Sequence, residues 1–497
     1  MTRTGAEYLE SLRDGRHVVI DGERVDDVTT HPAFRRSVQS FARLYDLTHE
    51  RPDVMTFPSP TTGRPVNRTY LIPRTQADLE SRRQAMRFWA QSHYGFLGRT
   101  PDHLASLLTA FAATPDVLAK GGPDFARNAI RMYERCRDDD LYMSYVIINP
   151  QIDKSRSASQ QEEDFLFAGV VAEHDDGFVV RGAKMIGTSA IFSNLVFVSS
   201  IQPMQADDID YALSFAIPIG TPGLRFYSRR SYEASATSVY DYPLSSRFDE
   251  NDCLVVFDDV KVPWENTFVY RNVDLTAAQF FQTPAHVYIN TQAQIRCWTK
   301  LEFIAGLAHR VADTNGVTKQ PIVADSLGRL ASLVALVEAG VRATEAACEP
   351  VENATDTVVR PNAKLMYATM ANAGPIYLQA IEILRTICGG GVIQVPSSVD
   401  DFFGPGAADI RRYVRSPGTP AEERVKLFKL AWDVIGSEFG SRHAQYEIFY
   451  SGGPQVARAY AYRNFDWGTG LEQVERCLAS TPLERGTISR PSTGDGR

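Results

Sequence analysis

The spacing of apolar residues changes twice along the chain. In the first part, apolar side chains recur every three or four positions, which is the period of an α-helix with one buried face. The segment Thr75-Gln76-Ala77-Asp78 has the Thr-x-x-Asp pattern that caps the start of a helix. We predict an N-terminal helical domain over residues 1–144, with helices at 32–50, 75–94, 101–113 and 125–136.

After Asn149-Pro150 the apolar period shortens toward two, as in strands. Short runs rich in β-branched and aromatic residues alternate with turn sequences such as Asp-Asp-Gly and Gly-Thr-Pro-Gly. This pattern predicts a central antiparallel β domain over residues 145–275, with strands at 165–171, 177–182, 194–201, 211–217 and 253–262.

From Phe280 onward long helical patterns return, and they predict a C-terminal four-helix-bundle domain over residues 276–480. Its helices are expected at 289–315, 322–347, 362–386 and 421–449. Residues 481–497 hold almost no large apolar side chain and are expected to form a disordered tail. Helices, strands and helices in this order indicate an α+β fold of three layers. No G-x-G-x-x-G or P-loop sequence follows a predicted strand, which argues against a doubly wound nucleotide-binding fold.

Charge and cysteine content narrow the possible partners. The 497 residues carry a net charge of −8, without a Lys and Arg run that follows a phosphate backbone, so nucleic acid is not expected as a partner. The six cysteines are scattered, with no CxxC pair and no zinc-finger spacing to histidine, so no metal site is expected. Neither a signal peptide nor a membrane-spanning run is visible, and we expect a cytoplasmic protein that does not bind a membrane.

Four polar segments are unusual for purely structural sequence: 98–103, 141–154, 181–190 and 388–398. The first sets an Arg before a helix start, and the second ends an apolar run in amide, acidic and basic groups suited to a ligand. The third has small and hydroxyl residues after a strand, and the glycines of the fourth let backbone amides face phosphate oxygens. Each segment alone also fits a structural role, as a helix cap, a strand leaving the core, a β-turn or a flexible helix end.

Together and in this order, the segments resemble the oxygenase component of the 4-hydroxyphenylacetate 3-monooxygenase family, over about residues 3–479. The resemblance rests on eight ordered motifs: Gly-Arg-Thr-Pro-Asp (98–102), Asn-Pro-Gln-Ile-Asp-Lys (149–154), Arg-Gly-Ala-Lys-Met (181–185), Pro-Leu-Ser-Ser-Arg-Phe-Asp-Glu (243–250), Val-Phe-Asp-Asp-Val with Val-Pro-Trp-Glu (256–265), Lys-Leu-Glu-Phe (300–303), Gly-Gly-Gly-Val-Ile-Gln-Val-Pro-Ser (389–397) and Gly-Ser-Glu-Phe-Gly-Ser-Arg (436–442).

The resemblance implies an acyl-CoA dehydrogenase-like α+β fold, in which an antiparallel β-barrel-like domain lies between two helical ones. It also implies a two-component flavin-dependent monooxygenase. A separate NAD(P)H:flavin reductase would supply diffusible reduced FAD, and the oxygenase would use it with O2 to hydroxylate a phenolic or other electron-rich aromatic substrate of secondary metabolism. A homotetramer is implied as well, with the turn at residues 389–391 near a subunit boundary.

The same resemblance implies roles for individual residues. Arg99, His103 and Tyr145 are the implied catalytic residues. A cation such as Arg99 stabilises an anionic flavin and a developing phenolate. Flavin binding is implied for Gln151, Asp153, Lys154, Ser157, Thr188, Ser189, Arg296, Gly389, Gly390, Gly391 and Arg442.

The chain also departs from the family pattern. Members that act on 4-hydroxyphenylacetate typically have Tyr in place of His103 and His in place of Tyr145, and many relatives have His in place of Thr291. The substrate is therefore open among substituted phenols, tyrosine derivatives and amino- or indole-bearing rings. An acyl-CoA dehydrogenase-like flavoenzyme, a nitrogen-oxidising monooxygenase and an inactive scaffold are alternatives. The family's iron-cluster dehydratases are not expected, because Arg99 and His103 stand where two cluster cysteines would lie.

Overall fold

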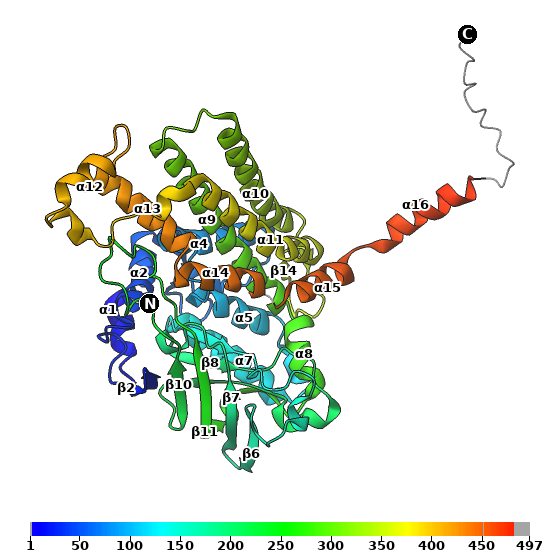
Figure 1. The fold of residues 1–497 in the computed structure, drawn as a ribbon. Helices are drawn as coiled ribbons and strands as arrows, with labels where there is room; N and C mark the ends of the chain where they lie inside the picture. Colours follow the sequence, from blue (N-terminus) through cyan, green and yellow to red (C-terminus); the bar gives the residue numbers. More distant parts are fainter. Residues whose placement is uncertain (1, 451, 482–497) are drawn as a thin grey trace, which may run out of the picture.

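The computed structural model describes residues 2–450 and 452–481 of the chain. Helices come first, two β-sheets follow and a helical bundle comes last, in the order that the apolar spacing predicts. In Figure 1 the larger sheet lies below the bundle. From residue 482 onward, the tail expected to be disordered lies outside the described residues.

The N-terminal part is mainly helical. Its helices are α1 (Gly5–Ser11), α2 (Arg35–Glu50), α3 (Pro52–Met55), α4 (Gln76–Ser92), α5 (Pro101–Ala113), α6 (Pro115–Ala119) and α7 (Pro123–Asp138). All four predicted helices are confirmed, as α2, α4, α5 and α7. The predicted cap of α4 is present, since Oγ1 of Thr75 accepts a hydrogen bond from the backbone N–H of Asp78. α5 is buried along nearly its whole length, and it therefore carries His103 into the interior.

Two open sheets form the central part, with strand orders β2-β1-β10-β11-β7-β6 and β12-β9-β8-β5. Their strands are β1 (His17–Ile20), β2 (Glu23–Val25), β5 (Met143–Val146), β6 (Gly169–His174), β7 (Gly177–Lys184), β8 (Leu195–Val198), β9 (Leu213–Pro218), β10 (Leu224–Ser228), β11 (Cys253–Pro263) and β12 (Thr267–Tyr270). The five predicted strands are confirmed as β6, β7, β8, β9 and β11, with shifted ends. Two small hairpins stand apart: β3 (Thr56–Pro58) with β4 (Pro65–Asn67), and β13 (Glu349–Pro350) with β14 (Val359–Arg360).

The expectation of an antiparallel, barrel-like domain needs two corrections. Neither sheet closes on itself, so the sheets form no barrel. Two strand pairs are parallel, β1 with β10 and β5 with β8. A parallel neighbour requires a long connection, and both β1 and β5 are followed by many residues before the chain reaches their partners. The larger sheet thus takes two strands from the N-terminal part of the chain.

The C-terminal part is helical. Its helices are α8 (Val273–Phe281), α9 (Ala285–Thr314), α10 (Pro321–Ala346), α11 (Ala363–Cys388), α12 (Ala407–Tyr413), α13 (Ala421–Ile435), α14 (Glu438–Phe449), α15 (Pro454–Asn464) and α16 (Trp467–Ala479). Three predicted helices are confirmed as α9, α10 and α11. The prediction of a single helix over 421–449 is wrong, because the first helix ends at Gly436 and a second begins after it. Ser437 then caps α14, with its Oγ accepting a hydrogen bond from the N–H of Gly440 at 3.0 Å.

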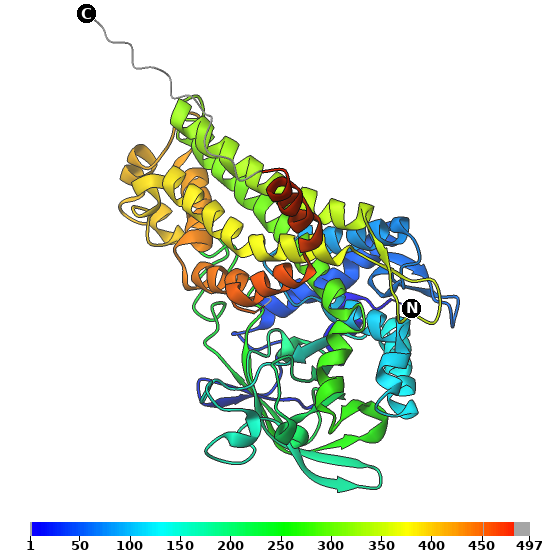
Figure 2. The same cartoon turned by 90° about the vertical axis from the view of Figure 1, so that its right-hand side faces the viewer.

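The long helix α9 joins the layers. α4, α5, α10 and α11 all pack against it, and Figure 2 shows the long bundle helices side by side above the strands. The first half of α9 is buried on every side, so residues near 290 meet side chains from the N-terminal helices. None of the helices described between residues 2 and 481 combines the length and apolar character of a membrane span.

Candidate active site

A cavity of about 2160 Å³ lies between the sheets and the bundle. α5, β5, the loop after β8, α8, α9, α14 and α15 all contribute side chains to its wall. Pockets for one small ligand usually have roughly 300–1,000 Å³. The cavity therefore has room for a large cofactor together with a substrate.

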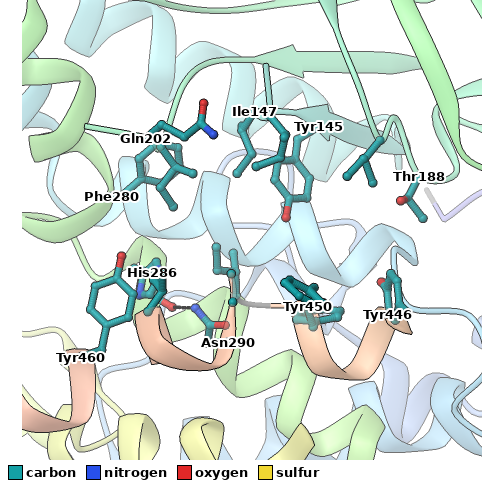
Figure 3. A pocket seen from close by; sticks show the side chains of 18 of the residues that line it. Tyr145, Ile147, Thr188, Gln202, Phe280, His286, Asn290, Tyr446, Tyr450 and Tyr460 are labelled. Atoms are coloured by element: carbon teal, nitrogen blue, oxygen red, sulfur yellow. Dashed lines mark hydrogen bonds between the residues drawn. The ribbon is translucent and has the colours of Figure 1, made fainter. Parts of the chain in front are cut away.

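The structure brings the three predicted catalytic residues together in this cavity. Arg99 precedes α5, His103 lies in the first turn of α5, and Tyr145 lies on β5. The rings of His103 and Tyr145 have centroids 5.1 Å apart, and the guanidinium carbon of Arg99 lies 4.9 Å from the Tyr145 ring centre. Tyr145 lies in the middle of the view in Figure 3. A helix start and a strand that are distant in sequence thus form one cluster.

Arg99 and His103 are hydrogen-bonded to each other. Nη1 of Arg99 lies 3.2 Å from Nε2 of His103. A guanidinium has no acceptor, so Nε2 accepts and the hydrogen of the neutral ring is on Nδ1. Nδ1 then faces Oε1 of Gln292 on α9, at 3.4 Å. Both ring nitrogens of His103 are therefore engaged within the protein.

The positive charge of this cluster resides on Arg99. Burial, together with the charge of Arg99, keeps the pKa of His103 well below its ordinary value. The imidazole is therefore neutral near pH 7. Burial also raises the pKa of the neighbouring Asp102 to about 6, even though Thr100 and Gln292 donate hydrogen bonds to its carboxylate.

Two tyrosines of α14 and the segment after it cover Arg99. The guanidinium carbon lies 4.0 Å from the ring centre of Tyr450 and 5.8 Å from that of Tyr446, so both rings contact the cation through their faces. Among the residues that the structure describes, the buried Oη of Tyr446 has no hydrogen-bond partner. A buried polar atom that lacks a partner and lies beside a cavity can form a hydrogen bond with a bound ligand. Gly98 leaves room for this ring, since a Cβ there would lie 2.0 Å from Oη of Tyr446.

Three polar side chains of the cavity wall are among the residues predicted to bind flavin. Gln151, Lys154 and Thr188 line the cavity, with amide, ammonium and hydroxyl groups suited to the polar edge of a flavin ring and to phosphate oxygens. The loop around Thr188 contains two non-glycine residues with left-handed backbone, Ile186 (φ 58°) and Ser189 (φ 59°). Strained backbone of this kind clusters at ligand sites. That these residues hold reduced FAD beside the Arg99 cluster stays a prediction.

Lys184 connects two of the polar segments. Its Nζ is buried and donates hydrogen bonds to Oδ1 of Asn149 and Oγ of Ser200, both at 2.7 Å. Burial lowers the pKa of this lysine to about 7. The side chain thus fixes the start of the 149–154 segment against β7. Within residues 2–450 and 452–481, no group of three or more His, Cys, Asp or Glu side chains is placed to hold a metal ion.

Arg442 lines the cavity, but its guanidinium is bound within the protein. Its Nη1 donates to Glu250 at 2.7 Å, and its Nε and Nη2 donate to Asp252 at 3.0 and 2.7 Å. Glu250 also accepts a hydrogen bond from the backbone N–H of Arg99 at 3.0 Å. Asp252 accepts one from the hydroxyl of Thr188 at 2.6 Å. Arg442 therefore joins α14 to the two loops that carry Arg99 and Thr188.

The other residues predicted to bind flavin lie outside the cavity wall of this chain: Asp153, Ser157, Ser189, Arg296, Gly389, Gly390 and Gly391. Arg296 is buried, and its guanidinium forms two hydrogen bonds with Glu447, at 2.7 and 2.8 Å. The three glycines form a turn directly after α11. Contact between these residues and a flavin stays a prediction.

The sequence alone did not single out several residues of the site: Gln292, His286, Tyr446 and Tyr450. Gln292, not Thr291, faces His103 from α9, because the hydroxyl of Thr291 donates to the backbone carbonyl of Val287 within the helix. The two tyrosines follow Arg442 at spacings of four and eight residues, which places all three on one face of α14 or its extension. That spacing was a signal available in the sequence.

Comparison with known proteins identifies the family of this chain. The family model described as 4-hydroxyphenylacetate 3-hydroxylase N terminal matches residues 4–269, and the corresponding C terminal model matches residues 276–479. The chain is 38% identical to the 4-hydroxyphenylacetate 3-monooxygenase oxygenase component of Thermus thermophilus, over 91% of this chain and 92% of that protein. It is 36% identical to the pyoverdin chromophore biosynthetic protein PvcC of Pseudomonas aeruginosa, over 96% and 95% of the two chains.

A solved structure shows the same fold. The oxygenase component (HpaB) of 4-hydroxyphenylacetate 3-monooxygenase complexed with FAD superposes on this chain with a TM-score of 0.91. The two are 34% identical, and the superposition covers 96% of this chain and 98% of the other. The matched regions contain all eight motifs and every residue of the cavity wall except Val273 and Asp274. The chain belongs to the 4-hydroxyphenylacetate 3-hydroxylase family.

Proposed function

We propose that this chain is the oxygenase component of a two-component monooxygenase, which uses reduced FAD and O2 to hydroxylate a phenol or another electron-rich aromatic ring. The observation that carries the proposal is the cluster of Arg99, His103 and Tyr145 inside a cavity with room for both a flavin and a substrate. Relatives that are oxygenase components, one of them solved with FAD, support the same chemistry.

Reduced FAD, once it has reacted with O2, supplies the oxygen atom that enters the substrate ring. Arg99 contributes a fixed positive charge beside that ring. A cation close to a phenol lowers the pKa of its hydroxyl and stabilises the phenolate, whose ring carbons donate electrons more readily. Burial raises the pKa of Tyr145, although Arg99 acts against it, so the Tyr145 hydroxyl stays protonated and can donate to the phenolate oxygen.

His103 orients the cation. Its Nε2 accepts the hydrogen bond from Arg99, and its low pKa makes it a poor proton acceptor. The ring can take the proton of a phenol only if the guanidinium turns away from Nε2. The exchange of His and Tyr relative to enzymes that act on 4-hydroxyphenylacetate therefore supports a different substrate or a rotated orientation of the ring.

Aromatic walls keep water away from the reacting ring. Tyr450 covers Arg99 from the bundle side, and Phe280 of α8 lies on the opposite side of Tyr145 from Thr188 in Figure 3. Exclusion of water strengthens the interaction between Arg99 and a phenolate, because the local dielectric constant falls. It would also limit loss of the oxygen as hydrogen peroxide before the substrate ring reacts.

A separate NAD(P)H:flavin reductase is the proposed source of reduced FAD, and the availability of NAD(P)H favours the cytoplasm as the site of action.

A homotetramer is also proposed. Two large apolar side chains that follow the Gly389–Gly391 turn in sequence are strongly exposed, Ile393 at 78% and Phe403 at 81%. Exposed apolar groups of this size favour a subunit boundary at the turn, where the glycines would approach a neighbour's flavin.

The test is an anaerobic titration of the purified protein with reduced FAD, followed by O2 and a phenol. We expect a colourless apoprotein that binds reduced FAD and forms a hydroxylated product only when reduced FAD is supplied. A protein that is purified yellow and oxidises acyl-CoA esters would instead support the dehydrogenase alternative. Sedimentation as a monomer at micromolar concentration would contradict the tetramer.

A further inference from the structure

A second group of side chains lines the cavity beyond the Arg99 cluster. In Figure 3 the wall runs from Thr188 at one end, past Tyr145, to Phe280, His286 and Tyr460 at the other end. The predicted flavin-binding residue Thr188 assigns the flavin to its own end of the cavity. The opposite end therefore lies beyond the position of the reacting ring.

The helix α9 gives the scale of this separation. Gln292 contacts His103, and His286 lies six residues earlier on the same helix. Six residues correspond to about 9 Å along a helix axis. A substrate with a single ring, held at Arg99, would leave the His286 end of the cavity unfilled.

The far end is walled by rings. The centroid of the His286 ring lies 4.9 Å from those of Phe281 and Tyr460, and Tyr367 stacks on Tyr460 at 5.2 Å with an interplanar angle of 19°. α8, α9, α11 and α15 contribute one ring each. Aromatic faces and edges of this kind favour contact with another flat group.

The polar groups among these rings are uncharged. Nδ1 of His286 lies 2.9 Å from the hydroxyl of Tyr367, which fixes the imidazole plane. Burial lowers the pKa of His286 to about 4. In the described part of the chain, neither Nε2 of His286 nor the hydroxyl of Tyr460 has a hydrogen-bond partner. Arg360 also lines the cavity, but its guanidinium is paired with Glu349 at 2.8 Å. A charged group placed between His286 and Tyr460 would therefore lose hydration without gaining an unpaired buried counter-ion, whereas an amide would gain hydrogen bonds.

We propose that Phe281, His286, Tyr367 and Tyr460 form a recognition subsite for the far end of the substrate. The substrate is a phenol whose ring carries a long substituent that ends in a flat, uncharged, hydrogen-bonding group such as an aryl amide. This inference rests on the proposed function, because the Arg99 cluster must hold the phenol. The competing possibility is a carboxylate tail bound by Arg463, which is exposed and lies 5.8 Å from the Tyr460 ring centre.

Three phenols separate these possibilities: 4-methylphenol, 4-hydroxyphenylacetate and the anilide of 4-hydroxyphenylacetate. Their dissociation constants are measured by calorimetry on the protein with reduced FAD under anaerobic conditions, and kcat and KM follow with O2. The variants His286→Phe and Tyr460→Phe keep a ring and remove one polar group each. His309→Phe is the matched control, since His309 lies on the exposed part of the same helix and outside the cavity wall.

We expect the anilide to bind at least about tenfold more tightly than 4-methylphenol, because its second ring buries apolar surface. Each of the two variants should weaken the anilide about fivefold, as for one lost hydrogen bond, and should raise its KM more than it lowers kcat. 4-Methylphenol and the His309→Phe control should change less than about twofold.

Three results would overturn the inference: tightest binding of 4-hydroxyphenylacetate, equal binding of the anilide and 4-methylphenol, or equal weakening of both in the variants. Failure of the proposed function looks different. In that case the anilide would bind with the expected dependence on His286 and Tyr460, but no phenol would be hydroxylated when reduced FAD and O2 are supplied.

Discussion

The guanidinium of Arg99 donates a hydrogen bond to Nε2 of His103 across 3.2 Å. Because an arginine side chain can only donate, this bond fixes the tautomer of His103 and occupies the nitrogen that a base would use. Burial beside the cation also keeps the imidazole neutral. The pair therefore presents one oriented positive charge to the cavity.

Replacement of that charge should remove most activity. We expect Arg99→Ala to lower kcat by about 100-fold or more, as for the loss of one preorganised electrostatic contact to a reacting anion, while the protein stays folded. Single-turnover kinetics with reduced FAD supplied measures the effect. Arg310→Ala is the control, because Arg310 is exposed on α9. Turnover of Arg99→Ala at the wild-type rate would show that the cation does not act on the substrate.

His103 should behave as a positioning residue. In His103→Gln the amide oxygen can accept the Arg99 hydrogen bond in place of Nε2, so we expect kcat to fall only a few fold. His103→Phe keeps the ring but has no acceptor, and its kcat should fall about tenfold more, at every pH. The pH profile of kcat for the two variants and the wild type decides the role. If His103→Gln is as impaired as His103→Phe and the acidic limb of the profile disappears in both, His103 is a general base instead.

The exchanged pair should control substrate choice. The double variant His103→Tyr with Tyr145→His restores the arrangement typical of relatives that act on 4-hydroxyphenylacetate. We expect it to gain turnover of 4-hydroxyphenylacetate and to lose turnover of the phenol that the wild type prefers. Each single variant serves as a control, because the two rings lie 5.1 Å apart and should couple. Unchanged kinetics on both phenols would place the pair away from the substrate.

Buried histidines should make the protein less stable in mild acid. Burial lowers the pKa of His286 to about 4, and that of His93 to about 3 with a further contribution from nearby cations, both from an ordinary 6.5. Between the lowered and ordinary values the unfolded chain binds more protons, so the free energy of unfolding falls as the pH falls below about 6.5. The loss is about 1.4 kcal/mol per pH unit for each such group.

The variant His286→Phe tests this effect. Denaturant unfolding at about pH 7.5 and about pH 5 should show a smaller decrease in midpoint for His286→Phe than for the wild type. The comparison at matched pH removes the contribution of groups that act in the opposite direction, such as Asp102, whose pKa is raised to about 6. His309→Phe should follow the wild type. Equal decreases in His286→Phe and the wild type would mean that His286 is protonated in the folded state.

A side chain at position 98 should destabilise the protein. A Cβ at this position would lie 2.0 Å from Oη and 2.6 Å from Cζ of Tyr446, so Gly98→Ala must displace a buried ring beside Arg99. We expect a loss of about 1–3 kcal/mol in stability and weaker binding of reduced FAD. Gly306→Ala is the matched control, because a Cβ there meets no atom within 4 Å and alanine favours the helix by roughly 0.5–1 kcal/mol. Equal thermal midpoints for the two variants would show that the Tyr446 ring moves without cost.

The local pattern of apolar residues was enough to predict most of the helices and strands. Apolar spacing depends on which face of each segment is buried, and it predicted α5, α9, α10 and α11 as well as the five strands of the central region. The ordered motifs were enough to predict the family, and they singled out Arg99, His103 and Tyr145, which the structure brings together in the cavity. The break at Gly436 was missed because α13 and α14 keep a continuous helical pattern, and the cap at Ser437 is a single-residue signal.

Only the tertiary structure decided how those residues act. Which strands are neighbours depends on long-range packing, so β1 with β10 and β5 with β8 pair in parallel where the local pattern predicted an antiparallel domain. The approach of Gln292 from α9 to His103 depends on how two buried helices, α5 and α9, pack. Burial then sets the protonation of His103, because removal of water disfavours a second positive charge beside Arg99. The sequence by itself determined which chemical groups are present, and packing determined which of them carries the charge.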